Sequence, residues 1–421
     1  ASIGVSDIAF HPTNPDRIWI ATGDGDFGDT RSIGIWTSSD GGLTWEATGL
    51  DWGTNLGRTL TRILVHPSDP DTLWTASSLG VYRSTNGGEN WIRTLTGNYA
   101  ALEIDPSNPG HLLAGEYGND IAESHDAGAT WEVNSLDGNS FGISRIALAF
   151  APSAPDTVYA VAGKNNDQGF AGFWRSTDGG ASWTARMLEG EGPNVLGWTV
   201  NGEDTGGQAW YDLTLAVHPQ NPDQVHVGGV NLWGSEDGGG QWQCAAHWYA
   251  GADLPYLHAD QHGLKYLEDG RMLVANDGGA FVFDPATASS ADKSAGLAIT
   301  QAYRLDLDPQ AIDRLLVGTQ DNGTFMKHEG AWEHVLGGDG FQCSFHGALS
   351  EVVYASLYYG QVFRSDDGGN AFHQIAGNAG SEENEQGAWL TPWEVSPFNP
   401  DWVYIAKDKV YRSTNRGNQW V

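Results

Sequence analysis

The chain has 421 residues, a length that suits two or three ordinary domains or one large repetitive domain. Its 53 acidic and 21 basic residues give a formal net charge of −32, which makes nucleic acid and anionic membranes poor partners. A hydrophobic content of 40% with 19 Trp excludes wholesale disorder, and we find no apolar run of about 18 residues that could insert into a membrane.

Glycine is abundant and methionine scarce, with 57 Gly against 3 Met, which favours many short strands joined by tight turns and hence an all-β fold. The chain begins at Ala1 without an initiator Met or a charged-then-apolar leader, as a mature exported protein would. Cys244 and Cys343 are the only cysteines, and we expect buried free thiols rather than a bridge.

A repeated unit begins at the N-terminus. An alternating apolar strand over 8–10 runs into an Asn14-Pro15-Asp16 turn, and a second strand follows over 17–21. A box with the pattern Ser-x-Asp/Asn-x-Gly-x-x-Trp/Phe comes next. Seven copies of this box occur, at 38–45, 84–91, 124–131, 176–183, 235–242, 365–372 and 413–420.

The long gap between Asp237 and Asp367 holds two further strand-turn-strand patterns, over 263–284 and 303–326, so we predict nine units of about 47 residues. Each unit is typical of a four-stranded antiparallel sheet, which must bury its faces against neighbouring sheets. We therefore predict an all-β fold, a β-propeller with nine blades, and a solenoid is the alternative.

The blades are expected to form one continuous array over 1–421 that closes a single ring of nine or ten. The alternative is a seven-bladed propeller over 1–333, with the first blades of a second propeller over 334–421. In either arrangement the box joins the two outer strands of a blade, so its carboxylates are structural rather than catalytic.

The boxes resemble the Asp-box, or BNR, repeats of sialidases, of family-74 xyloglucan hydrolases and of the ten-bladed sortilin ectodomain. A longer string of motifs is similar to large secreted BNR-repeat proteins of the Bacteroidetes type, which often carry a C-terminal sorting domain. These motifs lie at 206–213, 227–231, 258–262, 276–279, 320–324 and 337–340. The resemblance implies a secreted or cell-surface protein that is part of a longer chain.

Sialidases and family-74-like enzymes are the two candidate classes of glycoside hydrolase. A sialidase needs three converging arginines, and the Phe/Tyr-Arg-Ile-Pro sequence of that family is missing. A family-74-like enzyme needs two carboxylates about 6.5–9.5 Å apart if it inverts, for which Asp260, Asp212 and Asp339 are the candidates. Aromatic loops that would stack on sugars are present, but those enzymes pair two seven-bladed domains, which 421 residues cannot contain.

Residues at the starts of the inner strands should ring one mouth of a propeller channel, where ligands often bind. The predicted ligand-binding set is Asp7, Arg62, Arg145, Tyr211, Arg304 and Trp393. Arginines and aspartates placed in this way could equally form mutual salt bridges, and both interpretations stay open.

No cofactor is certain, and two patterns suggest a divalent cation. His258, Asp260 and His262 alternate along a strand-like segment, so period 2 would place them on one face as metal ligands or as an acid–base pair. Asp24, Asp26 and Asp29 crowd one loop and could bind calcium, with an ordinary polar turn as the alternative.

We predict an extracellular module that binds a glycan or a protein partner at the channel mouth. This interpretation depends on strong structural repeats without an intact catalytic signature. The alternative is a glycoside hydrolase, xyloglucanase-like or less plausibly sialidase-like, with a carboxylate pair at that mouth.

Overall fold

The computed structural model describes residues 4–26, 28, 30–136, 142–249, 253–377 and 386–421. Within these residues nine antiparallel sheets follow one another in chain order, eight with four strands and one with three. The only helices in these ranges are two 3-10 turns, Thr54–Leu56 and Tyr358–Gly360. The predicted all-β propeller with nine blade repeats is therefore confirmed.

The chain divides into two compact units, 1–295 and 296–421. The first unit contains six sheets and the second contains three. Neither the predicted array over 1–421 nor the alternative boundary after residue 333 coincides with this division. The boundary falls in a strand-free stretch at 293–301, between the sixth and seventh sheets.

The first three sheets of the first unit are built from consecutive strands. Their bounds are β1 (Val5–Phe10), β2 (Ile18–Thr22), β3 (Gly34–Ser38) and β4 (Glu46–Asp51); β5 (Leu60–Val65), β6 (Leu73–Ser77), β7 (Gly80–Ser84) and β8 (Ile92–Thr96); and β9 (Tyr99–Ile104), β10 (Leu112–Glu116), β11 (Asp120–Ser124) and β12 (Glu132–Ser135).

The next three sheets complete the first unit in the same way. They comprise β13 (Ile143–Phe150), β14 (Val158–Lys164), β15 (Phe170–Ser176) and β16 (Thr184–Leu188); β17 (Thr214–Val217), β18 (Val225–Gly228), β19 (Leu232–Ser235) and β20 (Gln243–Ala246); and β21 (Gln261–Tyr266), β22 (Met272–Asn276), β23 (Gly279–Asp284) and β24 (Ser289–Asp292).

The second unit has two four-stranded sheets and one three-stranded sheet. Its strands are β25 (Ala302–Leu307), β26 (Leu315–Thr319), β27 (Gly323–His328) and β28 (Ala331–Leu336); β29 (Cys343–Phe345), β30 (Val353–Ser356), β31 (Val362–Ser365) and β32 (His373–Ala376); and β33 (Trp393–Val395), β34 (Val403–Ala406) and β35 (Val410–Ser413).

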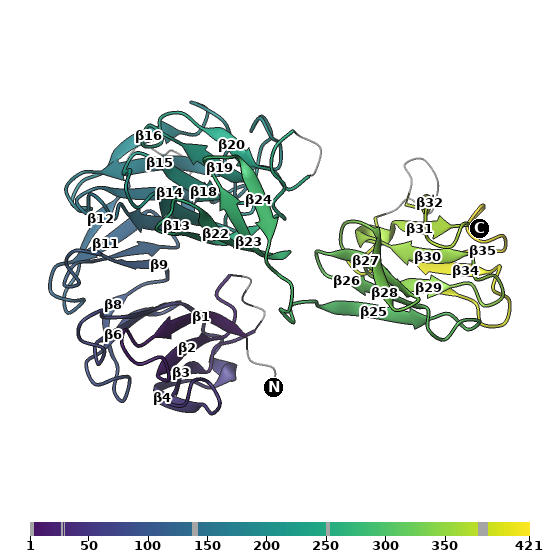
Figure 1. Ribbon diagram of the computed structural model, residues 1–421, viewed down its shortest axis with the longest axis horizontal. Helices are drawn as coiled ribbons and strands as arrows, with labels where there is room; N and C mark the ends of the chain where they lie inside the picture. The colour runs from purple at the N-terminus through teal and green to yellow at the C-terminus, as the bar shows by residue number, and fades with distance from the viewer. Residues whose placement is uncertain (1–3, 27, 29, 137–141, 250–252, 378–385) are drawn as a thin grey trace. The chain divides into compact units, whose positions relative to one another are not determined.

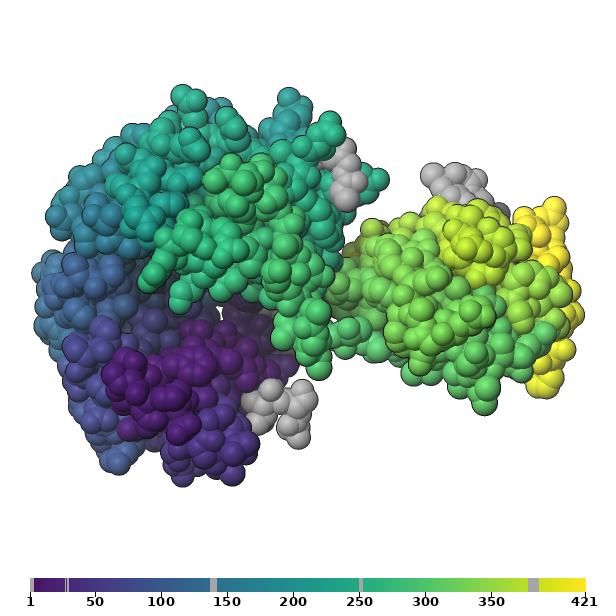
Figure 2. Space-filling view, in the orientation of Figure 1, coloured from purple at the N-terminus to yellow at the C-terminus, as the bar shows by residue number. Residues whose placement is uncertain are grey.

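The first strand of each sheet is the inner one in the first unit, because β1, β5, β9, β13, β17 and β21 contact one another in sequence. Figure 1 shows these sheets succeeding one another around the unit, and Figure 2 shows the unit hollowed between its purple first sheet and its green sixth sheet. The boxes lie between the third and fourth strands, so they are far from the inner strands, as predicted.

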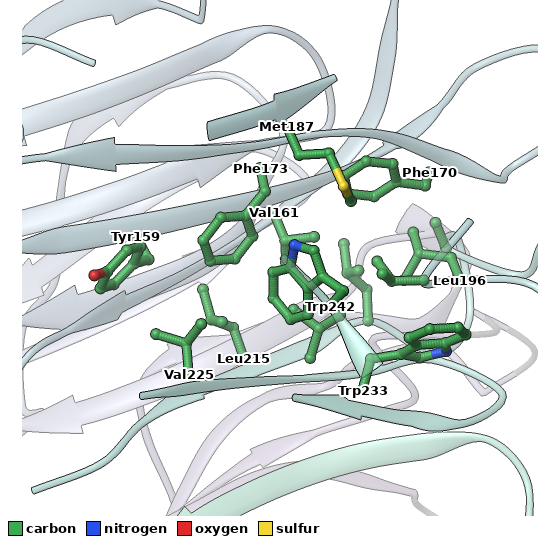
Figure 3. Packing of buried hydrophobic residues seen from close by; sticks show 14 of the residues in the cluster. Tyr159, Val161, Phe170, Phe173, Met187, Leu196, Leu215, Val225, Trp233 and Trp242 are labelled. Atoms are coloured by element: carbon green, nitrogen blue, oxygen red, sulfur yellow. The ribbon is translucent and has the colours of Figure 1, made fainter. Parts of the chain in front are cut away.

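Hydrophobic faces of adjacent sheets form the core. Between the fourth and fifth sheets, the Phe173 ring lies edge to face with Trp242 at 4.9 Å and is tilted against Tyr159 at 5.4 Å. Both Tyr159 and Phe173 are fully buried. Figure 3 shows this cluster, with Leu215 and Val225 of the fifth sheet facing Phe173. Buried apolar area of this kind is the main stabilising contribution that neighbouring blades give each other.

Each box is a hydrogen-bonded hairpin, as the third sheet illustrates. Ser124 donates its hydroxyl to Asp126 Oδ1 at 2.9 Å, and the same carboxylate accepts the Thr130 N–H at 2.8 Å. Gly128 has a φ of +76°, which L side chains disfavour, and its amide donates to Ser124 Oγ at 2.9 Å. Trp74 of the second sheet donates its indole N–H to the Ala127 carbonyl at 2.8 Å, so this box also binds its neighbour.

Candidate functional site

The inner strands of the first unit begin with a β-bulge that sets the direction of the predicted site residues. The pairing register shifts immediately before Asp7 in β1, before Arg62 in β5 and before Arg145 in β13. Bulges re-aim a side chain and increase local twist. The prediction that these three positions are equivalent therefore has a structural basis.

Asp7 and Arg62 belong to an ion chain that links the first three sheets. Arg62 lies 3.6 Å from Asp7 Oδ2 and 3.2 Å from Glu103 Oε1, and Asp7 also accepts the Ile63 N–H at 2.9 Å. The negative charges of Glu103 and Asp7 raise the pKa of Arg62, and burial opposes this rise. The salt-bridge interpretation thus describes this pair, and Glu103 was not foreseen from the sequence.

Asp26 connects three sheets that are distant in sequence. It lies in the loop between β2 and β3, yet its carboxylate is 2.7 Å from Arg145 Nη2 of the fourth sheet and 3.4 Å from His262 Nδ1 of the sixth sheet. Tyr117 of the third sheet donates to the Gly25 carbonyl at 3.3 Å. Burial would raise the pKa of Asp26, but Arg145 and His262 outweigh burial and hold it below its ordinary value.

His262 is held between two carboxylates. Its Nε2 is 2.8 Å from Asp277 Oδ1, opposite the contact with Asp26, and Tyr211 donates its hydroxyl to Asp277 Oδ2 at 2.8 Å. The Tyr211 ring stands edge-on to the imidazole at 4.6 Å. Burial lowers the pKa of His262, but Asp26 and Asp277 raise it to about 10, so the imidazole is a cation at neutral pH.

Asp212 and Asp260 form a coupled pair of carboxyl groups beside this histidine. Asp212 is 1% exposed, and burial together with the charge of Asp260 raises its pKa well above the ordinary value. Asp260 is half-buried and accepts the Gln208 amide at 2.9 Å. Burial and the charge of Asp277 raise the pKa of Asp260 to about 6. Two of the three candidate carboxylates, Asp212 and Asp260, are therefore neighbours, and their catalytic role stays a prediction.

We call these residues the carboxyl cluster: Asp26, Arg145, Tyr211, Asp212, Asp260, His262 and Asp277. Tyr211 was predicted at the site as well, and Arg145 Nη1 donates to its carbonyl at 3.1 Å. In the sequence, Asp277 stood out only as part of the motif at 276–279. The signal that could have found it is its Asn-Asp-Gly-Gly context beside the His-x-Asp-x-His segment.

The predicted metal site at His258, Asp260 and His262 stays a prediction, and the three residues do not lie on one regular strand. Asp260 has a φ of +65° and β21 begins only at Gln261, so the strand alternation that would align the three residues is broken. His258 Nδ1 faces the Ala259 carbonyl at 3.3 Å, and both ring nitrogens of His262 face carboxylates.

The predicted calcium loop has a different set of contacts. Asp24 Oδ1 accepts the Asp26 N–H at 2.9 Å, while the Asp26 carboxylate faces two cationic side chains instead of an open position. Asp29 lies outside the described residues. Calcium at Asp24 and Asp26 stays a prediction.

Three predicted residues lie in the second unit. Asp339 accepts hydrogen bonds from Gln320 Nε2 at 2.8 Å and from the Asp321 N–H at 2.9 Å. Arg304 is exposed and donates to the Tyr303 carbonyl at 2.9 Å. Trp393 is 3% exposed and packs in the core of this unit, because its inner-strand position faces the neighbouring sheet.

Exposed aromatic side chains occur beside the carboxyl cluster and elsewhere in both units. Trp210 is 39% exposed and packs against Tyr211 at 5.4 Å, and Trp248 donates its indole N–H to the Trp198 carbonyl at 3.0 Å. In the second unit Tyr358 stacks on Trp389 with an interplanar angle of 11°. Flat, half-exposed rings of this kind suit stacking on sugar faces.

Two cavities of the described structure lie elsewhere in the first unit. They have volumes of about 600 and 580 Å³, and both are lined by Trp242, Gln243 and Cys244 of the fifth sheet. No residue of the carboxyl cluster lines either cavity. Cys244 and Cys343 are both free, in agreement with the prediction.

Comparison with known proteins connects this fold with xyloglucan-degrading enzymes. A xyloglucanase from Paenibacillus sp. is 27% identical over 296 residues, which cover 57% of this chain and 26% of that protein. Xyloglucanase Xgh74A from Acetivibrio thermocellus is 28% identical over 303 residues, covering 58% of this chain and 32% of that protein. The chain thus matches about a third or less of these relatives' length. No protein-family profile matches it.

Solved structures show the same architecture. The GH74 xyloglucanase from Xanthomonas campestris superposes with a TM-score of 0.67 at 17% identity, over 99% of this chain and 66% of that one. The GH74 enzyme of Niastella koreensis gives a TM-score of 0.53 at 16% identity, over 99% and 71%. The fold is therefore a β-propeller array like that of the GH74 enzymes. No helix in the described ranges is long and apolar enough to cross a membrane.

Proposed function

We propose that the chain is part of a glycoside hydrolase that cleaves the backbone of a β-glucan such as xyloglucan, with the carboxyl cluster as its catalytic site. The relatives and the structural neighbour that are xyloglucanases support this class of substrate. A polymer of this size is met outside the cell, which agrees with the expected secretion. The proposal replaces a purely binding module as the favoured function.

One observation carries the proposal: two carboxyl groups near His262 have pKa values that are shifted in opposite directions. The pKa of Asp260 is raised to about 6, while that of Asp26 is lowered. Glycoside hydrolysis requires one carboxylic acid to protonate the leaving oxygen and one carboxylate to activate water or attack the sugar. Environments that push two pKa values apart assign the two roles.

Asp260 is the proposed general acid and Asp26 the proposed carboxylate. Both are half-buried and open to a substrate, whereas Asp212 is enclosed and acts on Asp260 as a positioning residue. His262 stays cationic between Asp26 and Asp277, and its charge helps to hold the pKa of Asp26 below the ordinary value. Trp210 offers a flat surface for a neighbouring sugar unit.

The test is release of reducing ends from xyloglucan and from an unbranched β-glucan. We expect Asp260→Asn to lower the rate by about 10²–10⁴-fold, as loss of a general acid does. Asp26→Asn should also abolish turnover, and the rate of the unmodified chain should fall as the pH rises through about 6, because Asp260 loses its proton there. Asp126→Asn, which changes a box carboxylate, is the matched control and should retain full activity.

Affinity electrophoresis in the same polysaccharides separates the two functions. Retardation without release of reducing ends would support the binding module and refute the hydrolase. Turnover that survives Asp260→Asn unchanged would refute the assigned acid.

A further inference from the structure

A second group of polar side chains lies in the third sheet, apart from the carboxyl cluster. His111 precedes β10, Glu123 lies in β11 and His125 follows that strand. Glu123 Oε1 is 3.1 Å from His111 Nε2 and 3.0 Å from His125 Nε2, and the three candidate ligand atoms all lie within 4.8 Å of one another. Among the residues that the structure describes, no other group of three His, Cys, Asp or Glu side chains brings its ligand atoms this close together.

The spacing of these atoms suits a small divalent ion. Ligands about 2.0–2.1 Å from a tetrahedral zinc lie roughly 3.3 Å from each other, close to both measured nitrogen–oxygen distances. His111 and Glu123 are nearly enclosed, whereas His125 is 66% exposed. The two imidazole rings are stacked at 4.6 Å, so binding requires the exposed His125 ring to tilt toward the carboxylate.

Asp105 completes the arrangement behind the histidine. Its Oδ2 is 3.2 Å from His111 Nδ1, and its Oδ1 is fixed by the N–H groups of Ser107 and Asn108 at 2.7 and 3.1 Å. Histidines that bind metals commonly donate their second ring N–H to a carboxylate, which fixes the tautomer and orients the ring. His111 therefore already has the support that a metal ligand needs.

The other repeats of the chain show that the box does not require these residues. The position of Glu123, just before the box serine, is Arg83 in the second repeat and Arg175 in the fourth. The position of His125 is threonine in the same two repeats, at Thr85 and Thr177, and that of His111 is also threonine there, at Thr72 and Thr157. The third repeat carries all three departures together.

The competing explanation is an ion pair made by a protonated His111. Arg314 of the seventh sheet forms such a pair with Asp308 at 3.2 Å, at the positions that correspond to His111 and Asp105. An ion pair needs only one cation, however, and does not explain why a second imidazole, that of His125, lies on the same Glu123 oxygen.

We propose that His111, Glu123 and His125 bind one divalent transition-metal ion, with zinc as the first choice. Two imidazoles and a carboxylate are ligands that Zn²⁺ favours, and the exposed side of His125 leaves a fourth position for water. The site is separate from the carboxyl cluster and its proposed chemistry.

The chain should be stripped with a chelator, dialysed and titrated with Zn²⁺ by calorimetry, with Co²⁺ absorption as a reporter of tetrahedral coordination. We expect one ion per chain, and about tenfold or greater weakening in His125→Thr, which installs the residue of the neighbouring repeats on an exposed position. Glu123→Gln should weaken binding similarly.

His66→Asp is the matched control, because His66 Nδ1 accepts the Ser68 and Asp69 N–H groups at 3.2 and 2.9 Å, as Asp105 does in the third repeat. The control should bind zinc as the unmodified chain does. Failure of the unmodified chain to bind a stoichiometric ion would overturn the proposal, and so would equal binding by His125→Thr or equal loss in the His66 control. Unchanged circular dichroism of His125→Thr separates lost binding from lost folding.

Discussion

Replacing Asp26 by Asn should lower the pKa of His262 by about two pH units. The imidazole titrates at about 10, against an ordinary value of 6.5, although burial alone would lower it. Asp26 and Asp277 must therefore supply more than the whole rise between them. An even division leaves the pKa at roughly 8 when either carboxylate is removed, which corresponds to about 3 kcal/mol of interaction with the charged ring.

The Asp277→Asn variant should cause the larger fall, because Asp277 lies 2.8 Å from His262 and Asp26 lies 3.4 Å away. Removing both carboxylates should lower the pKa further, because burial disfavours the charged ring and only neighbours such as Asp260 then favour it. The measurement is an NMR titration of the histidine Cε1–H signals, with the His262 signal assigned by its absence in His262→Gln. Asp126→Asn is the control and should leave the value unchanged. A His262 pKa that stays near 10 in Asp26→Asn would refute the contact across the sheets.

Three further predictions concern stability. The folded-state pKa of His262 is raised, so its contribution is fully present below pH 6.5 and is lost as the pH rises toward about 10. Denaturant titrations over that range should show a decline that His262→Gln removes, and an equal decline in the variant would contradict the assignment. Asp126→Ala should destabilise the chain by about 1 kcal/mol through lost hydrogen bonds, whereas Asp126→Asn should be tolerated as Asn86 is in the second box, with urea midpoints as the readout. Phe173→Ala should cost about 4 kcal/mol in the same assay, because the ring is fully buried between two sheets, and a loss below about 1 kcal/mol would contradict that packing.

The sequence was sufficient for the repeated sheets because the box marks the same hairpin in each unit. Even the two units without a box were found, since strand alternation and turn residues persist in 263–284 and 303–326. The division at 295/296 was not predictable from the repeat. The periodic pattern continues through the strand-free stretch, and no residue there interrupts the count.

The site was predicted in part, for a physical reason. Residues on inner strands could be located by counting back from each turn, which found Arg145 and Asp212. Asp26, the partner of Arg145, could not be located in this way, because it lies in a loop whose contact with Arg145 depends on tertiary packing. The interruption of the strand at Asp260, between His258 and His262, could not be predicted because a positive φ is invisible in a period-2 pattern.

The preference for a binding module came from strong structural repeats without an intact catalytic signature. Because 421 residues cannot hold two seven-bladed domains, the hydrolase was kept only as the alternative. The chain instead superposes on 66% of the Xanthomonas campestris enzyme, so the sheets of a larger array are the proper comparison.

The meeting of Asp26, Arg145 and His262 has a consequence for biosynthesis. These residues leave the ribosome at widely separated times, since Asp26 and Arg145 alone are 119 positions apart. In a nascent chain that ends before the sixth sheet, Asp26 lacks its contact with His262, and Asp212 lacks its neighbour Asp260. The carboxyl cluster, in this architecture, would be assembled late and all at once, as the last sheet of the first unit docks.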